Sequence, residues 1–297
     1  MNSATRRKIN KLLRKLRVYK TWVKYQTWRK DKIQEKYRHI HEFEAVINGS
    51  VVKFSTADDY SNRWFFPRYF GGKMHERSVT ELLLKSLRQA ECFADVGANL
   101  GWYTCLASKH MPAGQIYSFE MDTLNFDILR KNVALNNCQN VETILAAVSE
   151  KAGTARYLRY FDRPDPTFRL MTDKEASSQK ATLISVPAIT LDTFFQSRNI
   201  MPDVIKIDVE GAEMQVLKGM AGILREAKPV LYLEVHPWNF PVFNTSIEEI
   251  LNLLTTEGYT IFDIPNMRSA KGRIVLRKIH PKTRLTRNTM LYATSAK

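Results

Sequence analysis

Apolar segments of two kinds alternate along the chain from residue 92 onward. Short runs such as "CFADVG" and "VLYLEVH" are mostly apolar over five to seven positions, which is typical of strands buried on both faces of a sheet. Longer segments such as "NFDILRKNVALNN" repeat apolar residues at three- and four-residue steps and predict helices. The pattern predicts strands at residues 92–97, 115–120, 141–148, 202–208, 229–236, 260–264 and 288–294, and helices at 102–111, 125–137, 212–227 and 247–258.

This alternation predicts an α/β fold with a doubly wound, mostly parallel sheet that is covered on both faces. The last two strands have no clear helix between them, which predicts a closing antiparallel pair joined by a long basic loop at 266–287. Upstream, residues 78–90 have helical spacing, and two apolar stretches flank a turn at 48–50 in a short β-containing region. Residues 152–190 show neither pattern and are expected to be irregular.

The first 40 residues differ from the rest in charge. They contain 14 Lys and Arg residues against two acids, whereas the other 257 residues carry 31 basic and 28 acidic side chains. Apolar side chains recur at helical steps from residue 9 to residue 23, so a cationic amphipathic helix is predicted. It could lie on an anionic membrane, which is favoured, pack on its own domain, or bind RNA. The predicted division is therefore an extension at 1–40, the β-containing region at 41–80 and a main domain at 81–297.

Cysteine usage and hydropathy limit the class of protein further. Cys92, Cys105 and Cys138 show no CxxC spacing, which argues against a disulfide framework or a zinc site and for a reducing compartment. No run of about 18 uncharged apolar residues occurs, and the first residues lack the apolar core of a signal peptide. We therefore expect a cytoplasmic protein, or one held peripherally on the inner face of a membrane by residues 1–40.

Two strand ends predict a cofactor site. The first strand leads into "ADVGANLGWYT", where Gly97 and Gly101 lie at the strand-to-helix turn that binds ligands in doubly wound sheets. Asp95 precedes Gly97 where the dinucleotide fingerprint GxGxxG has a glycine. It would repel a pyrophosphate and attract a sulfonium, which favours S-adenosylmethionine over NAD. The second strand ends at Glu120, where a carboxylate can accept hydrogen bonds from both ribose hydroxyls.

Smaller residues near these strand ends have two interpretations each. Asn99 can bind the ligand or cap the helix that follows. Ala146 and Ala147 would leave room for a flat adenine ring, but small alanines are also ordinary core residues, and the sequence supports both interpretations equally.

Three carboxylates stand where the fourth strand meets its helix, in "KIDVEGAE". A site role is favoured for Asp208, whereas for Glu210 a site role and helix capping are equally supported. Glu213 is interpreted as a capping residue. In the fifth strand, Glu234 and His236 lie two positions apart, on one face of the strand and near its end.

Several of these segments resemble the FkbM-type S-adenosylmethionine-dependent methyltransferases. The resemblance rests on "DVGANLGWYT", "SFEMDTLNFDILRKNVALNN", "AAVSEKAG" and, most distinctively, "VPAITLDTFF…MPDVIKIDVEGAEMQVLKG" followed by "LYLEVHP". It extends over about half of the chain, from residue 92 to residue 238. One departure is Met121-Asp122, where the family often has a proline after the glutamate, and this changes the turn.

The resemblance implies a class I methyltransferase (Rossmann-like) fold, S-adenosylmethionine as cofactor, and O-methylation of a hydroxyl on a sugar, a glycan or a secondary metabolite. Cofactor contacts are expected at Asp95, Gly97, Ala98, Asn99, Gly101, Glu120, Met121, Asn125, Ala147, Asp208 and Glu210. The expected catalytic residues are His236, Glu234 and Asp208, and no metal is expected. Nothing carries over to the basic N-terminus or to the basic loop at 266–287.

Methyl transfer to a hydroxyl is an in-line displacement that a base assists. A histidine with an ordinary pKa of about 6.5 can be neutral in the cell, so His236, with Glu234 or Asp208, is the predicted base. Arginines and aromatics at 156–171 suit an anionic or sugar-bearing acceptor, but a surface insertion explains them equally. Two other functions stay open: an RNA methyltransferase that grips RNA with the basic helix, and a membrane-docked cofactor-binding protein without catalysis.

Overall fold

The computed structural model describes residues 39–69, 74–160, 181–265, 267 and 273–295, together with six helical positions between residues 21 and 35. Most of the predicted basic helix and much of the predicted acceptor loop lie outside these residues. Tyr25 and Trp28, two of the six helical positions, are more than half exposed, and their ring centroids lie 5.9 Å apart. The membrane, self-packing and RNA interpretations of the N-terminus stay predictions.

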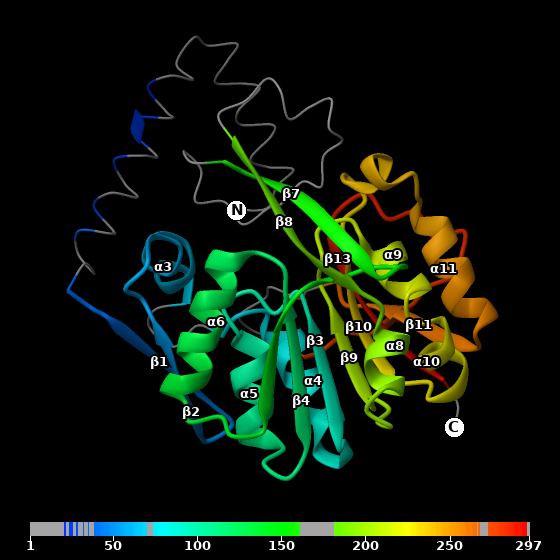
Figure 1. The fold of residues 1–297 in the computed structure, drawn as a ribbon, viewed down its shortest axis with the longest axis horizontal. Helices are drawn as coiled ribbons and strands as arrows, with labels where there is room; N and C mark the ends of the chain where they lie inside the picture. The colour runs from blue at the N-terminus through cyan, green and yellow to red at the C-terminus, as the bar shows by residue number, and fades with distance from the viewer. Residues whose placement is uncertain are drawn as a thin grey trace.

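In the described part of the chain, an eight-stranded sheet forms the centre of the molecule (Figure 1). Its order is β12-β11-β13-β10-β9-β3-β4-β5; the strands from β10 to β5 are parallel, and β13 is antiparallel to β10 and β11. The strands are β3 (Cys92–Val96), β4 (Gln115–Glu120), β5 (Val141–Leu145), β9 (Val204–Ile207), β10 (Val230–Val235), β11 (Tyr259–Asp263), β12 (Arg277–Lys278) and β13 (Thr289–Ser295). The predicted fold class is confirmed, and the chain order reverses between β3 and β9, where ligands bind in such sheets.

Helices cover both faces of this sheet, and each face has its own apolar core. Phe93 and Tyr232 point toward the core that contains α4, α5 and α6, whereas Ala94 and Leu233 point toward the core that contains α8 to α11. The helices are α4 (Arg77–Ser86), α5 (Trp102–His110), α6 (Thr123–Leu135), α8 (Leu191–Gln196), α9 (Glu213–Lys218), α10 (Ala221–Glu226) and α11 (Ile247–Thr256). Because neighbouring strand residues serve opposite cores, the strands read as nearly continuous apolar runs.

The predicted turn at 48–50 joins two antiparallel strands, β1 (Glu42–Ile47) and β2 (Ser50–Ser55). Phe43 and Phe54 on this hairpin pack in the same core as α4 and α5. The predicted boundaries at residues 40 and 80 stay predictions, and the second falls within α4.

Two buried asparagines, Asn132 in α6 and Asn136 at its C-cap, attach the hairpin to this helix. The backbone N–H of Ser55 donates to Asn132 Oδ1 and that of Lys53 donates to Asn136 Oδ1, both over 2.8 Å. Asn132 Nδ2 in turn donates to the carbonyl of Leu100, in the turn before α5. These side chains satisfy backbone groups that would otherwise be buried without partners.

The stretch expected to be irregular is mostly β-structure where it is described. A strand predicted at 141–148 ends at Leu145, and β6 (Ala147–Val148) continues into a second sheet with β8 (Ala181–Ile189) and β7 (Gly153–Tyr160). Figure 1 shows β7 and β8 as a long hairpin that lies outside the main sheet. Residues 161–180 lie outside the described residues.

The helix predicted at 212–227 is two helices. α9 ends at Lys218 and α10 begins at Ala221, and Met220 between them has a φ of −129° and a ψ of 25°, outside the helical region. Gly219 beside it lies where a Cβ would overlap the carbonyl of Ser149. The apolar spacing did not predict α8 or the short turns α3 (Phe66–Tyr69), η1 (Ser61–Phe65) and η3 (Phe240–Phe243).

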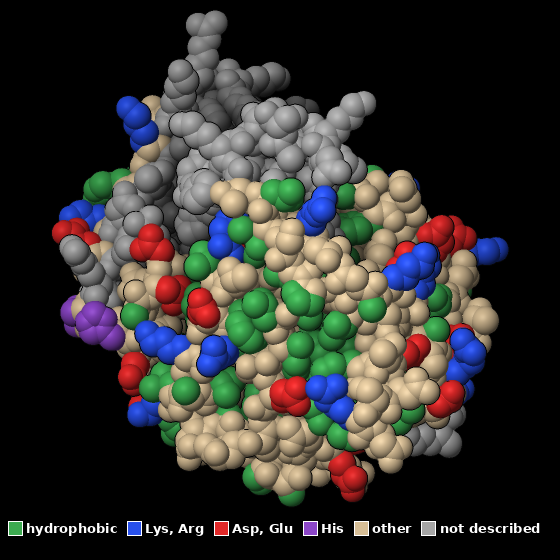
Figure 2. Space-filling model, in the orientation of Figure 1, with side chains coloured by type: hydrophobic (Ala, Val, Ile, Leu, Met, Phe, Trp, Pro, Cys, Tyr) green, Lys and Arg blue, Asp and Glu red, His purple; other side chains and the backbone are tan. Residues whose placement is uncertain are grey.

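The described surface mixes charges of both signs. In Figure 2, lysine, arginine and acidic side chains are interspersed around the face shown, and hydrophobic side chains gather near its centre. None of the helices in the described part of the chain has the length and apolar character needed to span a bilayer.

Replacing Asn132 with alanine removes the partners of two backbone groups, the Ser55 N–H and the Leu100 carbonyl. Each buried polar group left without a partner costs about 1–3 kcal/mol, so the free energy of unfolding should fall by at least 1 kcal/mol in urea titrations. Lys131→Ala on the exposed side of α6 is the control and should change it by less than about 0.5 kcal/mol. Equal stability of the two variants would contradict the anchoring role.

Candidate cofactor cleft and charged cluster

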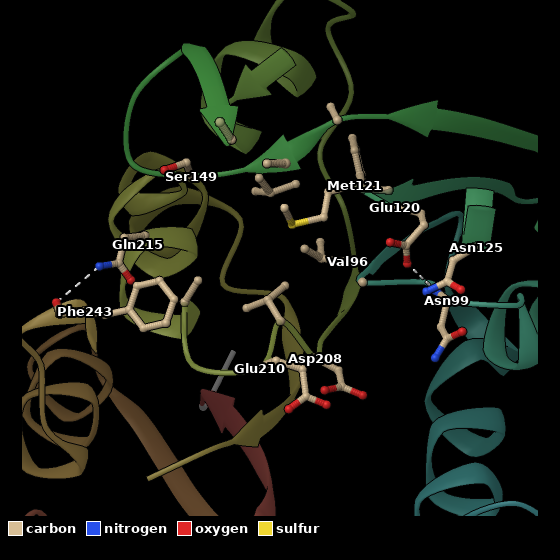
Figure 3. A pocket seen from close by; sticks show the side chains of 18 residues that line it. Val96, Asn99, Glu120, Met121, Asn125, Ser149, Asp208, Glu210, Gln215 and Phe243 are labelled. Atoms are coloured by element: carbon tan, nitrogen blue, oxygen red, sulfur yellow. Dashed lines mark hydrogen bonds between the residues drawn. The ribbon is translucent and has the colours of Figure 1, made fainter. Parts of the chain in front are cut away.

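A cavity opens at the carboxyl ends of β3, β4 and β9 (Figure 3). Its empty volume, including the part open to solvent, is about 960 Å³. Its lining residues are Val96, Gly97, Asn99, Phe119, Glu120, Met121, Asn125, Ala146, Ala147, Val148, Ser149, Ala155, Asp208, Val209, Glu210, Ala212, Gln215 and Phe243. Apolar side chains predominate, and the carboxylates are those of Glu120, Asp208 and Glu210.

Gly97 lets β3 and β9 approach each other at the base of the cavity. Its φ is +76°, and a Cβ there would overlap the backbone carbonyl of Asp208. The N–H groups of Gly97 and Ala98 both donate to the carbonyl of Phe119, which fixes the turn against β4. A glycine is therefore required at this position both by the backbone conformation and by the packing.

Glu120 at the end of β4 forms one wall of the cavity. Its Oε2 accepts the N–H of Asn99 over 2.7 Å and its Oε1 accepts the N–H of Asp122 over 2.8 Å. Burial raises the pKa of Glu120 to about 7, although these backbone N–H groups act in the opposite direction. Each oxygen keeps a second lone pair for a ligand hydroxyl.

The turn after Glu120 is tied to the second sheet. Asp122 caps α6 by accepting the N–H groups of Leu124 and Asn125, and its other oxygen accepts from Tyr157 over 2.9 Å and from Arg159 over 2.6 Å. This network fixes the position of β7, which places Ala155 in the cavity wall.

Asp95 does not line the cavity. It is fully buried on the α5 side of β3, where Thr104 donates 2.7 Å to Oδ2 and the Lys206 ammonium lies 3.8 Å from Oδ1. Burial raises the pKa of Asp95, and Lys206 and Thr104 only partly offset this. The expectation that the Asp95 carboxylate faces the sulfonium is corrected: this carboxylate faces Lys206 inside the core.

At another part of the wall, the carboxylates of Asp208 and Glu210 lie close together and point the same way (Figure 3). Lys206 Nζ is 3.5 Å from Asp208 Oδ2, and His236 Nε2 is 3.7 Å from Asp208 Oδ1 and 3.4 Å from Glu210 Oε2. Burial would raise the pKa of Asp208, but the Lys206 and His236 cations outweigh it and lower the pKa.

The loop that carries Glu210 is held in an unusual conformation. Glu210 has a φ of +52°, and its carbonyl accepts a hydrogen bond from Asn239 Nδ2 over 2.8 Å. At Gly211, φ is +116° and a Cβ would come within 2.5 Å of the Asn239 Cβ. A left-handed glutamate costs about 1–2 kcal/mol, so the surrounding contacts impose this position.

Glu213 is the first residue of α9, but its carboxylate makes no capping hydrogen bond to the helix, contrary to the prediction that it only caps it. Its Oε1 accepts the N–H of Gly211 over 2.9 Å and contacts Nδ1 of His236 at 2.7 Å, while the whole Glu213 side chain is buried. The imidazole is thereby fixed with Nε2 directed toward Asp208, Glu210 and Glu234.

These surroundings contradict the prediction that His236 is a neutral base. Burial lowers the pKa of His236, but the hydrogen bond with Glu213 and the carboxylates of Glu210, Asp208 and Glu234 raise it to about 10. In the ligand-free protein the imidazole is therefore protonated at cellular pH and has no lone pair for an acceptor proton.

Known proteins provide the decisive comparison. A family model described as "Methyltransferase FkbM domain" matches residues 95–261, more than half of the chain. The chain belongs to the FkbM methyltransferase family. It is therefore a methyltransferase, and its cofactor is S-adenosylmethionine.

The chain is also similar to individual methyltransferases. The chain is 28% identical over 193 residues to hexuronic acid methyltransferase AglP of Haloferax volcanii, which covers 65% of this chain and 73% of that protein. It is 25% identical over 242 residues to 31-O-demethyl-FK506 methyltransferase FkbM of Streptomyces tacrolimicus, and this match covers 72% of this chain and 87% of that protein. A solved S-adenosylmethionine-dependent methyltransferase from Agrobacterium tumefaciens is 11% identical, with a TM-score of 0.45 over 86% of this chain and 71% of that one.

Most residues expected to contact the cofactor border one cavity, although contact itself stays a prediction. Those that line it are Gly97, Asn99, Glu120, Met121, Asn125, Ala147, Asp208 and Glu210. Asp95, Ala98 and Gly101 are behind it, where Ala98 supports the turn and Gly101 begins α5. Sequence reasoning missed Ser149, Ala155, Gln215 and Phe243, and only Ser149, beside the predicted adenine-side alanines, carried a usable signal.

The residues present fit the cofactor. Glu120 has free lone pairs for ribose hydroxyls, and the apolar side chains that line most of the cavity suit an adenine ring.

Cofactor affinity should depend on the ionisation of Glu120. Ribose hydroxyls donate to the carboxylate form, so as pH falls below the pKa of about 7 the bound proton must be released first. Below this pKa the affinity should fall as pH falls, with a slope that approaches about tenfold per pH unit. Above about pH 8 it should be constant. Calorimetric titrations at pH 5.5–8.5 measure this, and Glu120→Gln should bind more weakly with a flatter profile. Identical pH profiles for both proteins would contradict the role of Glu120.

Gly97→Ala should abolish or severely weaken cofactor binding and lower the melting temperature, because the added methyl group meets the Asp208 carbonyl. Gly49→Ala is the matched control: Gly49 has a similar φ of +82° with nothing near its missing Cβ. The control therefore measures the conformational cost alone, about 1–2 kcal/mol. Equal losses of stability and normal cofactor binding in both variants would contradict the packing argument.

Proposed function

We propose that the chain is an O-methyltransferase that modifies a hydroxyl on a sugar, a glycan or a secondary metabolite. The observation that carries the proposal is the pair of partly exposed carboxylates, Asp208 and Glu210, which line the same cavity as Glu120. Carboxylates at this place can bind a hydroxyl and remove its proton as the methyl group arrives.

S-adenosylmethionine, when bound, supplies a methyl group activated by a sulfonium. Glu120 and the Gly97 turn would hold its nucleoside end at one side of the cavity. Asp208 and Glu210 would then lie where an acceptor approaches the methyl group. Alignment of the two reactants can contribute about 7–11 kcal/mol of the lowered barrier.

Glu210 is the better candidate for the proton acceptor. Asp208 lies 3.5 Å from Lys206 and 3.7 Å from His236, and Glu210 lies 3.4 Å from His236. The Glu210 side chain is 32% exposed, and its backbone is held toward the cavity by Asn239. His236 positions both carboxylates rather than accepting the proton itself.

One relative supports a hydroxyl acceptor, because it is named for the 31-O-demethyl position of FK506. Another is named for a hexuronic acid, which carries both hydroxyl groups and a carboxylate. A sugar bearing a carboxylate also agrees with the arginines predicted to recognise the acceptor, although most of that segment lies outside the described residues.

The proposal is tested by incubating the purified chain with methyl-labelled cofactor and a panel of acceptors. The panel contains neutral sugars, uronic acids, glycolipid extracts and total RNA. Label in a base-stable methyl ether of a sugar or metabolite supports the proposal. Label in RNA would replace it with the RNA methyltransferase alternative, and cofactor binding without transfer to any hydroxyl would favour the non-catalytic one.

With the best acceptor, Glu210→Gln should reduce turnover by about 10²–10⁴-fold, the usual contribution of a general base. Cofactor affinity measured by calorimetry should be nearly unchanged, because the amide keeps the shape of the side chain. Glu248→Gln on the exposed surface of α11 is the control and should be fully active. Full turnover by Glu210→Gln would remove Glu210 from the reaction.

A further inference from the structure

At the ends of β9 and β10, three side chains offer ligand atoms that face one another. Atoms of Asp208, Glu234 and His236 all lie within 4.8 Å of one another. Glu234 and His236 are almost completely buried, and Asp208 borders the cavity. No metal was expected from the sequence, but these three residues are of the types that bind metal ions.

The distances do not describe an ordinary hydrogen-bonded ion pair. His236 Nε2 is 3.4 Å from Glu210, 3.7 Å from Asp208 and 3.8 Å from Glu234, whereas a charge-assisted hydrogen bond measures about 2.7–2.9 Å. Neighbouring ligands around a divalent cation at about 2.1 Å are roughly 3.0–3.4 Å apart, depending on the coordination geometry. The ligand atoms of Asp208, Glu234 and His236, which lie within 4.8 Å of one another, would move closer together around a common cation.

A second observation is the orientation of the His236 ring. Its Nδ1 is held at 2.7 Å by Glu213, a carboxylate with no exposed surface, and this contact directs Nε2 into the cluster. A histidine that binds a metal through one nitrogen usually donates from the other to a carboxylate or carbonyl, which fixes its tautomer. His236 is 2% exposed, so its ring has no alternative orientation toward solvent.

The charges around the imidazole also favour a bound cation. Four carboxylates, from Asp208, Glu210, Glu213 and Glu234, lie within 4 Å of its nitrogens. One imidazole balances at most one of these four charges, and Lys206, 3.5 Å from Asp208, balances a second. The negative charge that remains favours a bound cation.

We propose that Asp208, Glu234 and His236 bind one divalent cation, of the Mn²⁺ or Mg²⁺ type, next to the acceptor end of the cavity. Two carboxylates with one imidazole suit such an ion, and Mn²⁺ tolerates the mixed oxygen and nitrogen set best. The cation holds the acceptor hydroxyl and lowers its pKa; this part rests on the proposed O-methyltransferase function.

The step balances without another reactant. The acceptor oxygen forms a bond to the methyl carbon as the carbon–sulfur bond breaks and leaves its electron pair on sulfur. The hydroxyl proton passes to the Glu210 carboxylate. Glu213 takes no part in this step and acts as a positioning residue for His236.

Binding is measured first, without acceptor or cofactor. The full chain is treated with a chelator, and Mn²⁺ is titrated by calorimetry and by electron paramagnetic resonance of the free ion. We expect one site per chain. Glu234→Gln should weaken it at least tenfold, and Glu213→Gln by about 10–100-fold, as for other residues that orient a ligand. Glu248→Gln, an exposed acid on α11, should bind like the original protein.

Folding and function are separated from binding by two further measurements. Mn²⁺ should raise the melting temperature of the original protein, a measurement that requires no variant. S-adenosylmethionine should bind Glu213→Gln normally, which shows that this variant is folded. Cation binding without methyl transfer to any hydroxyl keeps the site and removes the proposed function. If the original protein binds Mn²⁺, Mg²⁺ and Zn²⁺ no more tightly than Glu234→Gln does, the proposal is overturned. The cluster is then a protonated histidine among its carboxylates.

Discussion

The buried ammonium group of Lys206 is the interaction on which the arrangement of the site depends. It lies in the middle of the sheet, 3.8 Å from Asp95 on β3 and 3.5 Å from Asp208 at the end of β9, and over the ring of Tyr103 at 5.1 Å. Burial lowers the pKa of Lys206, but Asp208 and Asp95 outweigh this and raise it. A buried cation of this kind is stable only with such partners, so the two carboxylates are held at fixed positions on either side of it. One of them remains in the core and the other reaches the cavity.

This pairing explains which site residues the sequence could predict. Gly97, Glu120 and Asp208 follow from their places at strand ends, because the ends of neighbouring parallel strands meet at one edge. The role of Asp95 did not follow, since it depends on the register that sets Asp95 beside Lys206 on the adjacent strand. Residues more than a hundred positions apart in the sequence carry no pattern that reveals such a neighbour.

The same limit applies to His236 and to the second sheet. An imidazole has an ordinary pKa until its neighbours are known, and here Glu213 and Glu210 come from a different element. The strand β8 did carry a local signal: exposed and buried positions alternate along it, with Val186 and Ala188 inward. Its polar residues and proline obscured that alternation. The main strands and helices, by contrast, follow from apolar spacing that the sheet and its two cores require.

The position of β13 has a consequence for how the protein is made. β10 and β11 leave the ribosome before β13, yet they lie on either side of it and share no hydrogen bonds in the finished sheet. Until β13 emerges, β10 exposes a free edge and β11 can pair with it only in a non-native order. This half of the sheet must therefore assemble late in translation, and a chaperone that shields exposed strand edges would act during that interval.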